Sequence, residues 1–241
     1  MYDMLTRLDL HSRTTDNLAK ITIERSLPML TDHEIRRAIK VMRHTFPDAG
    51  TTLEADTTFH FLLATILSAQ ATDKSVNLIT PALFQRFPGP RDLAAVEPAD
   101  VKPYIKRLGL YRNKAKYLVN CSRAIIDDFG GTVPHTRKEL ISLPGVGRKV
   151  ADVVLAECFK IPAFAVDTHV SRVARRLAMV EPKATLLQIE HRLMAAVPER
   201  QWLDAHHSMI FWGRYQCTAR NPQCAHCPLL AMCKYGRNNV M

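Results

Sequence analysis

The chain has 241 residues, of which 47% are apolar and 23% are charged, and its formal net charge is +10. This length allows one large or two modest globular domains, and the basic surplus favours a polyanionic partner such as nucleic acid. No run of about 18 apolar residues is present, which excludes a membrane-spanning helix and a membrane partner. Charged residues also interrupt the first 30 positions. A signal peptide is therefore excluded, and we expect a cytoplasmic protein.

The predicted elements, taken in chain order, are all helices. The first opens with a capping box formed by Thr31 and Glu34, followed by apolar residues at helical spacing. Residues 59–68 are apolar nearly all round and are predicted to form a central buried helix. Asp73 is expected to cap the next helix. Because no segment alternates apolar and polar residues as a strand does, the fold class is predicted to be all-α.

The second half of the chain continues this pattern. A second capping box, Thr136 and Glu139, opens a short helix before a glycine-containing turn. Residues 163–166 are predicted to be a buried extended connector between two helical bodies. Residues 1–29 carry a weak pattern and are expected to be an N-terminal extension, in part without fixed structure. The remaining predicted helices cover 98–108, 113–129, 148–159, 168–180, 186–197 and 205–215.

The turn in question has the sequence LPGVGRKVADVV, residues 143–154. Its glycines permit positive φ and close backbone approach, and a helix beginning near Arg148 leaves free N–H groups at its positive end. Together these features form a seat for one phosphate. From the spacing alone, a plain tight turn between two helices remains an equal alternative.

Lys149 lies in the first turn of that helix. Together with Asp152 it falls outside the apolar stripe that includes Ala151, Val154 and Leu155, on the face predicted to point away from the core. A free lysine has a pKa of about 10.4, so only about one in a thousand is neutral near pH 7.4. The positive end of a helix dipole disfavours the charged form, which favours a nucleophilic amine. The alternative is an ordinary solvated lysine.

Four of the six cysteines lie close together near the end of the chain, at Cys217, Cys224, Cys227 and Cys233. Intervals of six, two and five residues allow four thiolates to surround one metal centre. A disulfide pair is disfavoured in the cytosol. The spacing does not distinguish structural zinc from an iron–sulfur cluster.

These motifs together resemble the endonuclease III family of DNA glycosylases. The resemblance rests on LPGVGRKVADVVL (143–155), VDTHVSRVARRL (166–177), SAQATD (68–73), GLYRNKA (109–115) and the cysteine run. It covers most of the chain. It implies a bilobal helix-hairpin-helix DNA glycosylase fold with a C-terminal iron–sulfur loop. The implied activity is that of a bifunctional glycosylase and AP (abasic-site) lyase, which excises oxidised pyrimidines from damaged duplex DNA and cleaves abasic sites by β-elimination.

The resemblance also implies roles for individual residues. Lys149 would be the nucleophile and Asp167, otherwise a plain helix cap, would support the cationic transition state. Leu110 would enter the duplex as a wedge, whereas composition alone favours a leucine packed inward. Gln70 would then face the orphaned base. The remaining implied DNA-binding residues are Gly145, Gly147, Arg148 and His169.

The cofactor implied by the resemblance is a [4Fe–4S] cluster held by the four cysteines. The expected division is a helical-bundle lobe over residues 51–162 and a cluster lobe that combines 30–50 with 163–241. The cluster loop offers only Arg220 as a cation, which leaves its share of DNA binding open. Cations expected along the DNA groove are Arg112, Lys114, Lys116, Lys138, Arg148, Lys149 and Arg220.

Two alternatives remain at this point. The first is a mismatch-specific glycosylase of the same superfamily, acting on adenine or on thymine and uracil. The second is a non-catalytic helix-hairpin-helix protein that only binds DNA. In each case we expect a monomer that associates with the nucleoid through DNA.

Overall fold

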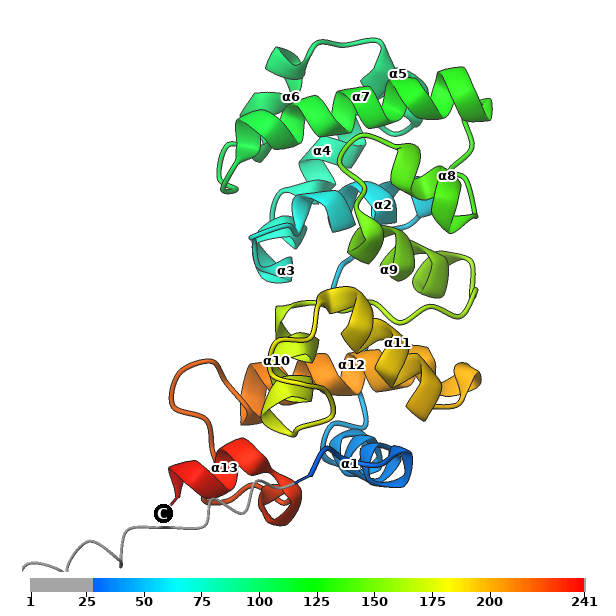
Figure 1. Ribbon diagram of the computed structural model, residues 1–241. Coiled ribbons are helices and arrows are strands. Elements are labelled where there is room, and N and C mark those ends of the chain that lie inside the picture. Colours follow the sequence, from blue (N-terminus) through cyan, green and yellow to red (C-terminus); the bar gives the residue numbers. More distant parts are fainter. Residues whose placement is uncertain (1–27, 241) are drawn as a thin grey trace, which may run out of the picture.

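The computed structural model describes residues 28–240, and the expectation for residues 1–29 lies almost wholly outside this range. All regular elements in the described part are helical, as predicted. Figure 1 shows two bodies, one above the other, with the chain passing between them twice. None of the helices between residues 28 and 240 is long and apolar enough to span a bilayer.

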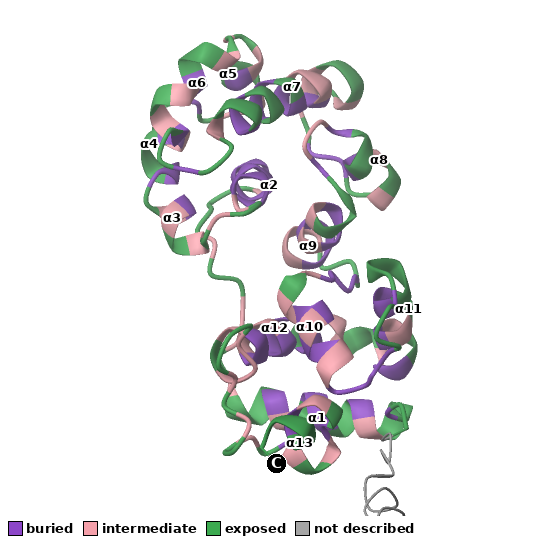
Figure 2. Cartoon of the chain, turned by 60° about the vertical axis from the view of Figure 1, so that its left-hand side comes forward, coloured by how far each residue is buried: buried purple, intermediate pink, exposed green. Residues whose placement is uncertain are grey.

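The first body is built around one central helix. Every residue of α2 from Phe59 to Leu67 is buried, which confirms the predicted core helix, and Figure 2 shows the other helices arranged around it. Its helices are α2 (Thr58–Leu67), α3 (Asp73–Asn77), α4 (Thr80–Arg86), α5 (Pro90–Ala94), α6 (Pro98–Ile105), α7 (Tyr111–Phe129), α8 (Arg137–Ser142) and α9 (Arg148–Cys158).

The second body joins the start of the described chain to its end. The predicted capping box of Thr31 and Glu34 is present at α1 (Asp32–Thr45), whose apolar face packs against α11 and α12. The other elements are α10 (Thr168–Arg176), α11 (Leu186–Ala196), η1 (Glu199–Gln201), α12 (Trp202–Phe211), the π-helical turn η2 (Trp212–Gln216), η3 (Leu230–Met232) and α13 (Lys234–Asn239).

Buried apolar side chains form two separate clusters, one in each body. The predicted connector, residues 163–166, is buried and belongs to no helix, and it passes from the first cluster at Ala163 to the second at Phe164. The division into lobes at 51–162 and at 30–50 with 163–241 remains our proposal, and the two clusters support it. Below, the two bodies are called the first lobe and the second lobe.

An ion pair links the two lobes at α9, and the burial of Asp152 beside it contradicts one prediction. Arg148, at the start of α9, donates from Nε and Nη2 to the two carboxylate oxygens of Glu190 on α11, both at 2.7 Å. Asp152 was predicted to point away from the core, but it is 1% exposed and accepts a 2.6 Å hydrogen bond from Arg137 of α8. The prediction was wrong because the second lobe and α8 cover this face of α9.

A second bridge between the lobes involves Asp73, which was predicted to cap α3. The cap is Thr72, whose hydroxyl accepts from the Ser75 N–H at 3.2 Å. The Asp73 carboxylate instead accepts from the Thr52 hydroxyl at 2.5 Å and from Arg214 of the second lobe at 2.9 Å. Asp73 therefore links the two lobes.

Candidate active site and iron–sulfur loop

The glycine turn joins α8 to α9 as predicted. Gly145 has φ of 84°, and a Cβ built on it would lie only 2.8 Å from Cβ of Tyr117 on α7. Gly147 is the N-cap of α9, and no side chain of the described chain caps this helix. The first N–H groups of α9 are therefore free to bind an anion, which fits the predicted phosphate seat.

Lys149 and Asp167 face the same space between the lobes. Both line an open hollow of about 610 Å³, here called the cleft pocket, together with Gln70, His169 and Arg214. Asp167 caps α10, since its Oδ1 accepts from the Val170 N–H at 2.8 Å. The structure thus brings the predicted nucleophile and the predicted carboxylate into one pocket.

Gln70 and Leu110 lie on neighbouring loops, in a backbone conformation that L-residues rarely adopt. Their φ values are 54° and 58°. Leu110 is 54% exposed, so the inward-packed alternative for this leucine is wrong. Gln70 is also exposed. Non-glycine residues held at positive φ cluster at functional sites, which is consistent with the wedge and base-partner roles.

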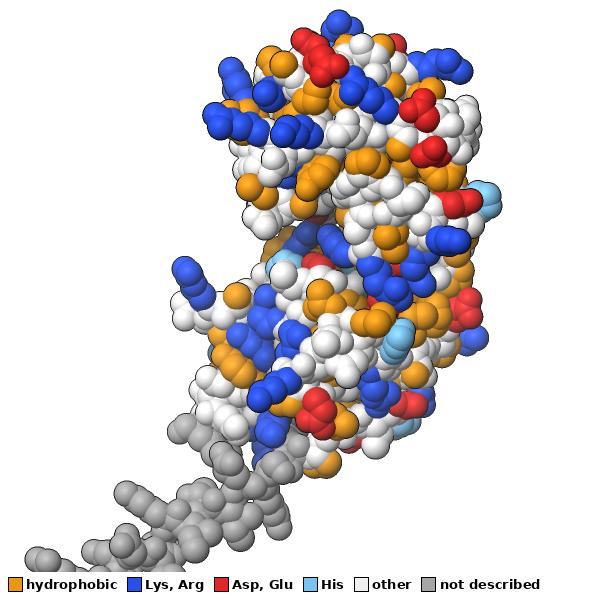
Figure 3. Space-filling model, turned by 45° about the horizontal axis from the view of Figure 1, so that its top comes forward, with side chains coloured by type: hydrophobic (Ala, Val, Ile, Leu, Met, Phe, Trp, Pro, Cys, Tyr) orange, Lys and Arg blue, Asp and Glu red, His pale blue; other side chains and the backbone are white. Residues whose placement is uncertain are grey.

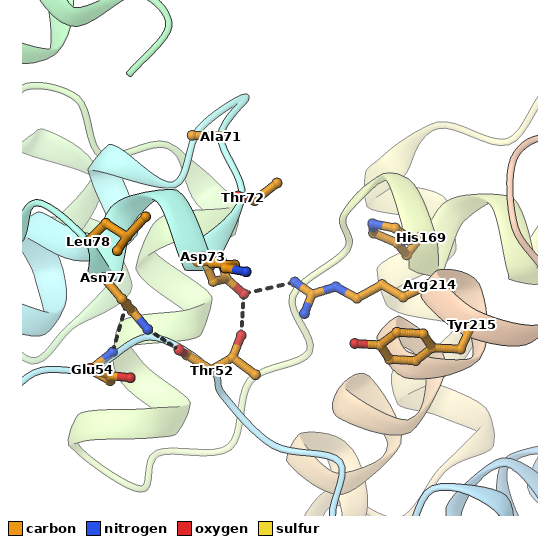
Figure 4. A pocket seen from close by; sticks show the side chains of 11 residues that line it. Thr52, Glu54, Ala71, Thr72, Asp73, Asn77, Leu78, His169, Arg214 and Tyr215 are labelled. Atoms are coloured by element: carbon orange, nitrogen blue, oxygen red, sulfur yellow. Dashed lines mark hydrogen bonds and ion pairs between the residues drawn. The ribbon is translucent and has the colours of Figure 1, made fainter. Parts of the chain in front are cut away.

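His169 lies on α10 at the rim of the cleft pocket. Burial lowers the pKa of this imidazole, and its Nδ1 is 3.1 Å from a guanidinium nitrogen of Arg172. Figure 4 shows His169 and Tyr215 facing Ala71, Thr72 and Leu78 across a second hollow. This side pocket adjoins the cleft pocket, because both hollows are lined by Ala71, Thr72, Asp73, His169 and Arg214.

Most of the cations predicted to line the DNA groove are exposed, but Lys114 is buried. Figure 3 shows Lys and Arg side chains beside the hollow between the lobes and over the second lobe. Lys114 is not among the exposed cations, because it is 2% exposed on the buried stripe of α7 formed with Leu118, Cys121 and Ile125. The predicted cations that are exposed are Arg112, Lys116, Lys138, Arg148, Lys149 and Arg220.

The four cysteines line one small apolar hollow in the second lobe, with Leu177, Trp212 and Leu230 among its walls. The Gly236 N–H donates to the Cys233 sulfur at 3.2 Å. Among residues 28–240, no three His, Cys, Asp or Glu side chains lie close enough to hold one ion. Four thiols around an apolar hollow with an N–H donor to sulfur fit an iron–sulfur cluster.

Arg176 organises this cysteine loop. Its guanidinium donates to the Thr218 carbonyl at 2.7 Å and the Ala219 carbonyl at 3.1 Å, and lies 3.3 Å from the Cys217 sulfur. It also stacks over the Tyr235 ring at 4.1 Å. One side chain of α10 thereby ties the first cysteine to the helix that Asp167 caps.

Comparison with known proteins identifies the family. Residues 63–199 match the family described as HhH-GPD superfamily base excision DNA repair protein, and residues 217–233 match the iron–sulfur binding domain of endonuclease III. Endonuclease III of Bacillus subtilis (strain 168) is 46% identical over 209 residues, which cover 87% of this chain and 95% of that protein. The chain belongs to the endonuclease III family.

Other members of the family agree in sequence and in fold. Endonuclease III of Escherichia coli (strain K12) is 40% identical over 80% of this chain and 92% of that protein. A solved structure of a trapped covalent endonuclease III–DNA intermediate has a TM-score of 0.87 and 44% identity, and covers 88% of this chain and all of that one. The predicted fold is confirmed, as are the activity of a bifunctional DNA glycosylase and AP lyase and the iron–sulfur cofactor.

Several residues of this endonuclease III site were missed from the sequence. Arg176, Glu190, His206 and Arg214 were read only as parts of predicted helices. Each contacts residues about 40 or more positions away in the chain. A charged residue inside an apolar helical stripe is the only signal that the sequence offers for such contacts, as at Glu190, which follows the buried Ile189.

Proposed function

We propose that Lys149 is the nucleophile and that Asp167 is its carboxylate partner. The observation that carries this proposal is their shared position in the cleft pocket, with Lys149 in the first turn of α9, next to the free amides that follow the glycine turn. A lysine nucleophile needs a route to the sugar and an adjacent ionised group. Both are present where the two lobes meet.

The reaction follows from these two groups. The Lys149 amine forms a bond to C1′ of a flipped nucleotide while the glycosidic bond breaks. The electron pair of the glycosidic bond leaves with the base, which takes up a proton. Opening of the sugar gives an iminium ion between Lys149 and C1′. This ion acidifies C2′, and loss of a C2′ proton expels the 3′ phosphate by β-elimination. Asp167 stabilises the cationic stages and accepts protons.

The substrate is damaged double-stranded DNA carrying oxidised or ring-saturated pyrimidines, or abasic sites. Solved endonuclease III structures with DNA, one covalent and one non-covalent, resemble this chain at TM-scores of 0.87 and 0.86. Flipping a base leaves a gap in the duplex, which the exposed Leu110 would fill while Gln70 contacts the orphaned base. The protein would act as a monomer, in the cytoplasm and on the nucleoid.

Gly145 and Gly147 would hold a phosphate through backbone amides, with His169 contacting DNA beside them. Arg148 is the least direct of the predicted DNA ligands, because Glu190 already binds its guanidinium. Its DNA role therefore requires that a phosphate compete with a buried carboxylate. Titration of Arg148→Ala with an abasic-site duplex at several salt concentrations measures that role. A salt dependence equal to that of the wild type would assign Arg148 to the lobe bridge alone.

The test of the nucleophile is borohydride trapping on a duplex with one oxidised pyrimidine. We expect a covalent protein–DNA adduct that disappears in Lys149→Ala, whereas Lys116→Ala, an exposed lysine on α7, keeps it. Asp167→Asn should retain DNA binding and lose most turnover. An adduct that survives in Lys149→Ala would overturn the assignment. A panel of duplexes with single lesions or mismatches then identifies the preferred base and its partner.

A further inference from the structure

Behind the cleft pocket lies a smaller, more enclosed cavity that Lys149 and Asp167 also line. This inner cavity has a volume of about 60 Å³. Its size allows at least two water molecules, at about 10–15 Å³ each by this measure. Its walls come from α2, α9, α12 and the segment 50–53, and include Thr65, Val153, Glu157, His206, His207 and Ile210.

His206 is held in one orientation at the wall of this cavity. It is 4% exposed, and its Nδ1 lies 2.8 Å from the carbonyl oxygen of Ala165, two residues before Asp167. The ring of Phe164 meets the imidazole edge-on at 6.2 Å, and the ring of His207 lies 5.2 Å away. A carbonyl oxygen only accepts hydrogen bonds, so Nδ1 carries the hydrogen.

The other ring nitrogen is therefore an acceptor. Burial, and next the neighbouring His207, lower the pKa of His206 to about 4, so the ring is neutral at physiological pH. Lys149 and Asp167 line the same cavity as His206, which places the imidazole near the pair. Within residues 28–240, Nε2 has no hydrogen-bond partner, and it is not among the buried polar atoms sealed off without one. Its lone pair is open to the cavity.

We propose that His206 is a positioning residue for Lys149: its Nε2 accepts a hydrogen bond from the lysine amine, directly or through one cavity water. The proposal rests on the proposed role of Lys149 as nucleophile. A neutral amine has two N–H groups and one lone pair, and it attacks C1′ only when the lone pair faces the sugar. With His206 and Asp167 as acceptors on the protein side, the N–H groups turn inward and the lone pair turns toward the DNA.

The fixed tautomer explains why a histidine suits this position. The same ring holds the connector through Nδ1 and the amine through Nε2, so the backbone next to Asp167 and the head group of Lys149 have one common support. Because the ring is neutral, it adds no positive charge beside the iminium that forms on Lys149. A second lysine or arginine at this position would repel that intermediate.

Two substitutions separate the two nitrogens. His206→Asn retains a donor near the place of Nδ1 and removes the outer acceptor, whereas His206→Gln reaches the place of Nε2. The measurement is the single-turnover rate of borohydride-trappable adduct on an abasic-site duplex, with the DNA dissociation constant measured alongside. Since a hydrogen bond between neutral groups contributes about 0.5–1.5 kcal/mol, we expect a loss of about two- to tenfold in His206→Asn. The dissociation constant should change less than twofold, and His206→Gln should recover most of the rate.

His60 provides the matched control in the first lobe. It is 8% exposed, its Nε2 lies 3.0 Å from the Pro88 carbonyl oxygen, and it stacks on Phe84 outside both cavities. His60→Asn should lower thermal stability and leave the single-turnover rate unchanged. A wild-type rate in His206→Asn, or equal losses in His206→Asn and His206→Gln, would overturn the proposal. If Lys149→Ala still gives an adduct, it is the role of Lys149 that fails.

Discussion

The glycine turn allows a sharp prediction, because its two glycines are needed for different reasons. Gly145 has positive φ, where an alanine costs about 1–2 kcal/mol. Its new Cβ would also lie 2.8 and 2.9 Å from Cβ and Cγ of Tyr117. The Cβ of Tyr117 is fixed by the α7 backbone and does not move when the side chain rotates, so relief of the overlap costs a further 1–3 kcal/mol, roughly. Gly145→Ala should thus reduce the free energy of unfolding by about 2–5 kcal/mol.

Gly147 is the internal control. Its φ is −90°, and a Cβ there would meet nothing within 4 Å. Alanine is a poorer N-cap than glycine, but it restricts the unfolded chain, and the two effects offset to within about 1 kcal/mol. Gly147→Ala should therefore fold as the wild type does. Any loss of DNA binding in this variant then reports on the phosphate seat and not on stability.

The assay is thermal unfolding followed by far-UV circular dichroism, with the cluster loaded in all three proteins. For a chain of this size, about 2–4 °C of Tm accompanies each kcal/mol, so Gly145→Ala should melt about 4–20 °C below the wild type. Equal losses in both variants would refute the reasoning, since only Gly145 has the strained φ and the close aromatic neighbour. A Gly145→Ala Tm within 1 °C of the wild type, roughly the error of the method, would refute it too.

Three further predictions concern buried charge and the cluster. Burial raises the pKa of Asp152 from 3.8 to about 6, so ionisation of this carboxyl penalises the folded state at neutral pH, and the penalty is relieved as the pH falls toward 4. Asp152→Asn should therefore gain about 2 kcal/mol relative to the wild type between pH 4 and pH 7 in urea titrations. A difference that stays constant with pH would refute the shift. Arg148→Ala leaves Glu190, which is only 4% exposed, without its main partner and should lower the free energy of unfolding by about 2–4 kcal/mol. The loss should exceed that in Glu190→Gln, and equal losses in the two variants would contradict the argument from burial. Arg176→Met should shorten the half-life of the visible cluster absorbance in air, whereas Arg220→Met, at an exposed position, should not.

The sequence by itself determined the features that depend on neighbours along the chain. The capping box at Thr31, the cap at Asp167, the buried helix α2 and the start of α9 all appeared where predicted. Each depends on hydrogen bonds or apolar spacing within a few residues, which a linear pattern contains. The cysteine intervals belong to this class too, because four ligands in one short loop need no distant partner.

Only the tertiary structure decided which side of each helix became the interior of the cleft. It buried Asp152, which the stripe of α9 had left outside, and brought together pairs such as Arg148 with Glu190 and His206 with Ala165, which lie 42 and 41 residues apart. The apolar pattern of a single helix does not show which of its faces the second lobe will cover. The inner face of the cleft pocket therefore arises from lobe packing, whereas the proposed nucleophile and its carboxylate partner can be identified from the sequence alone.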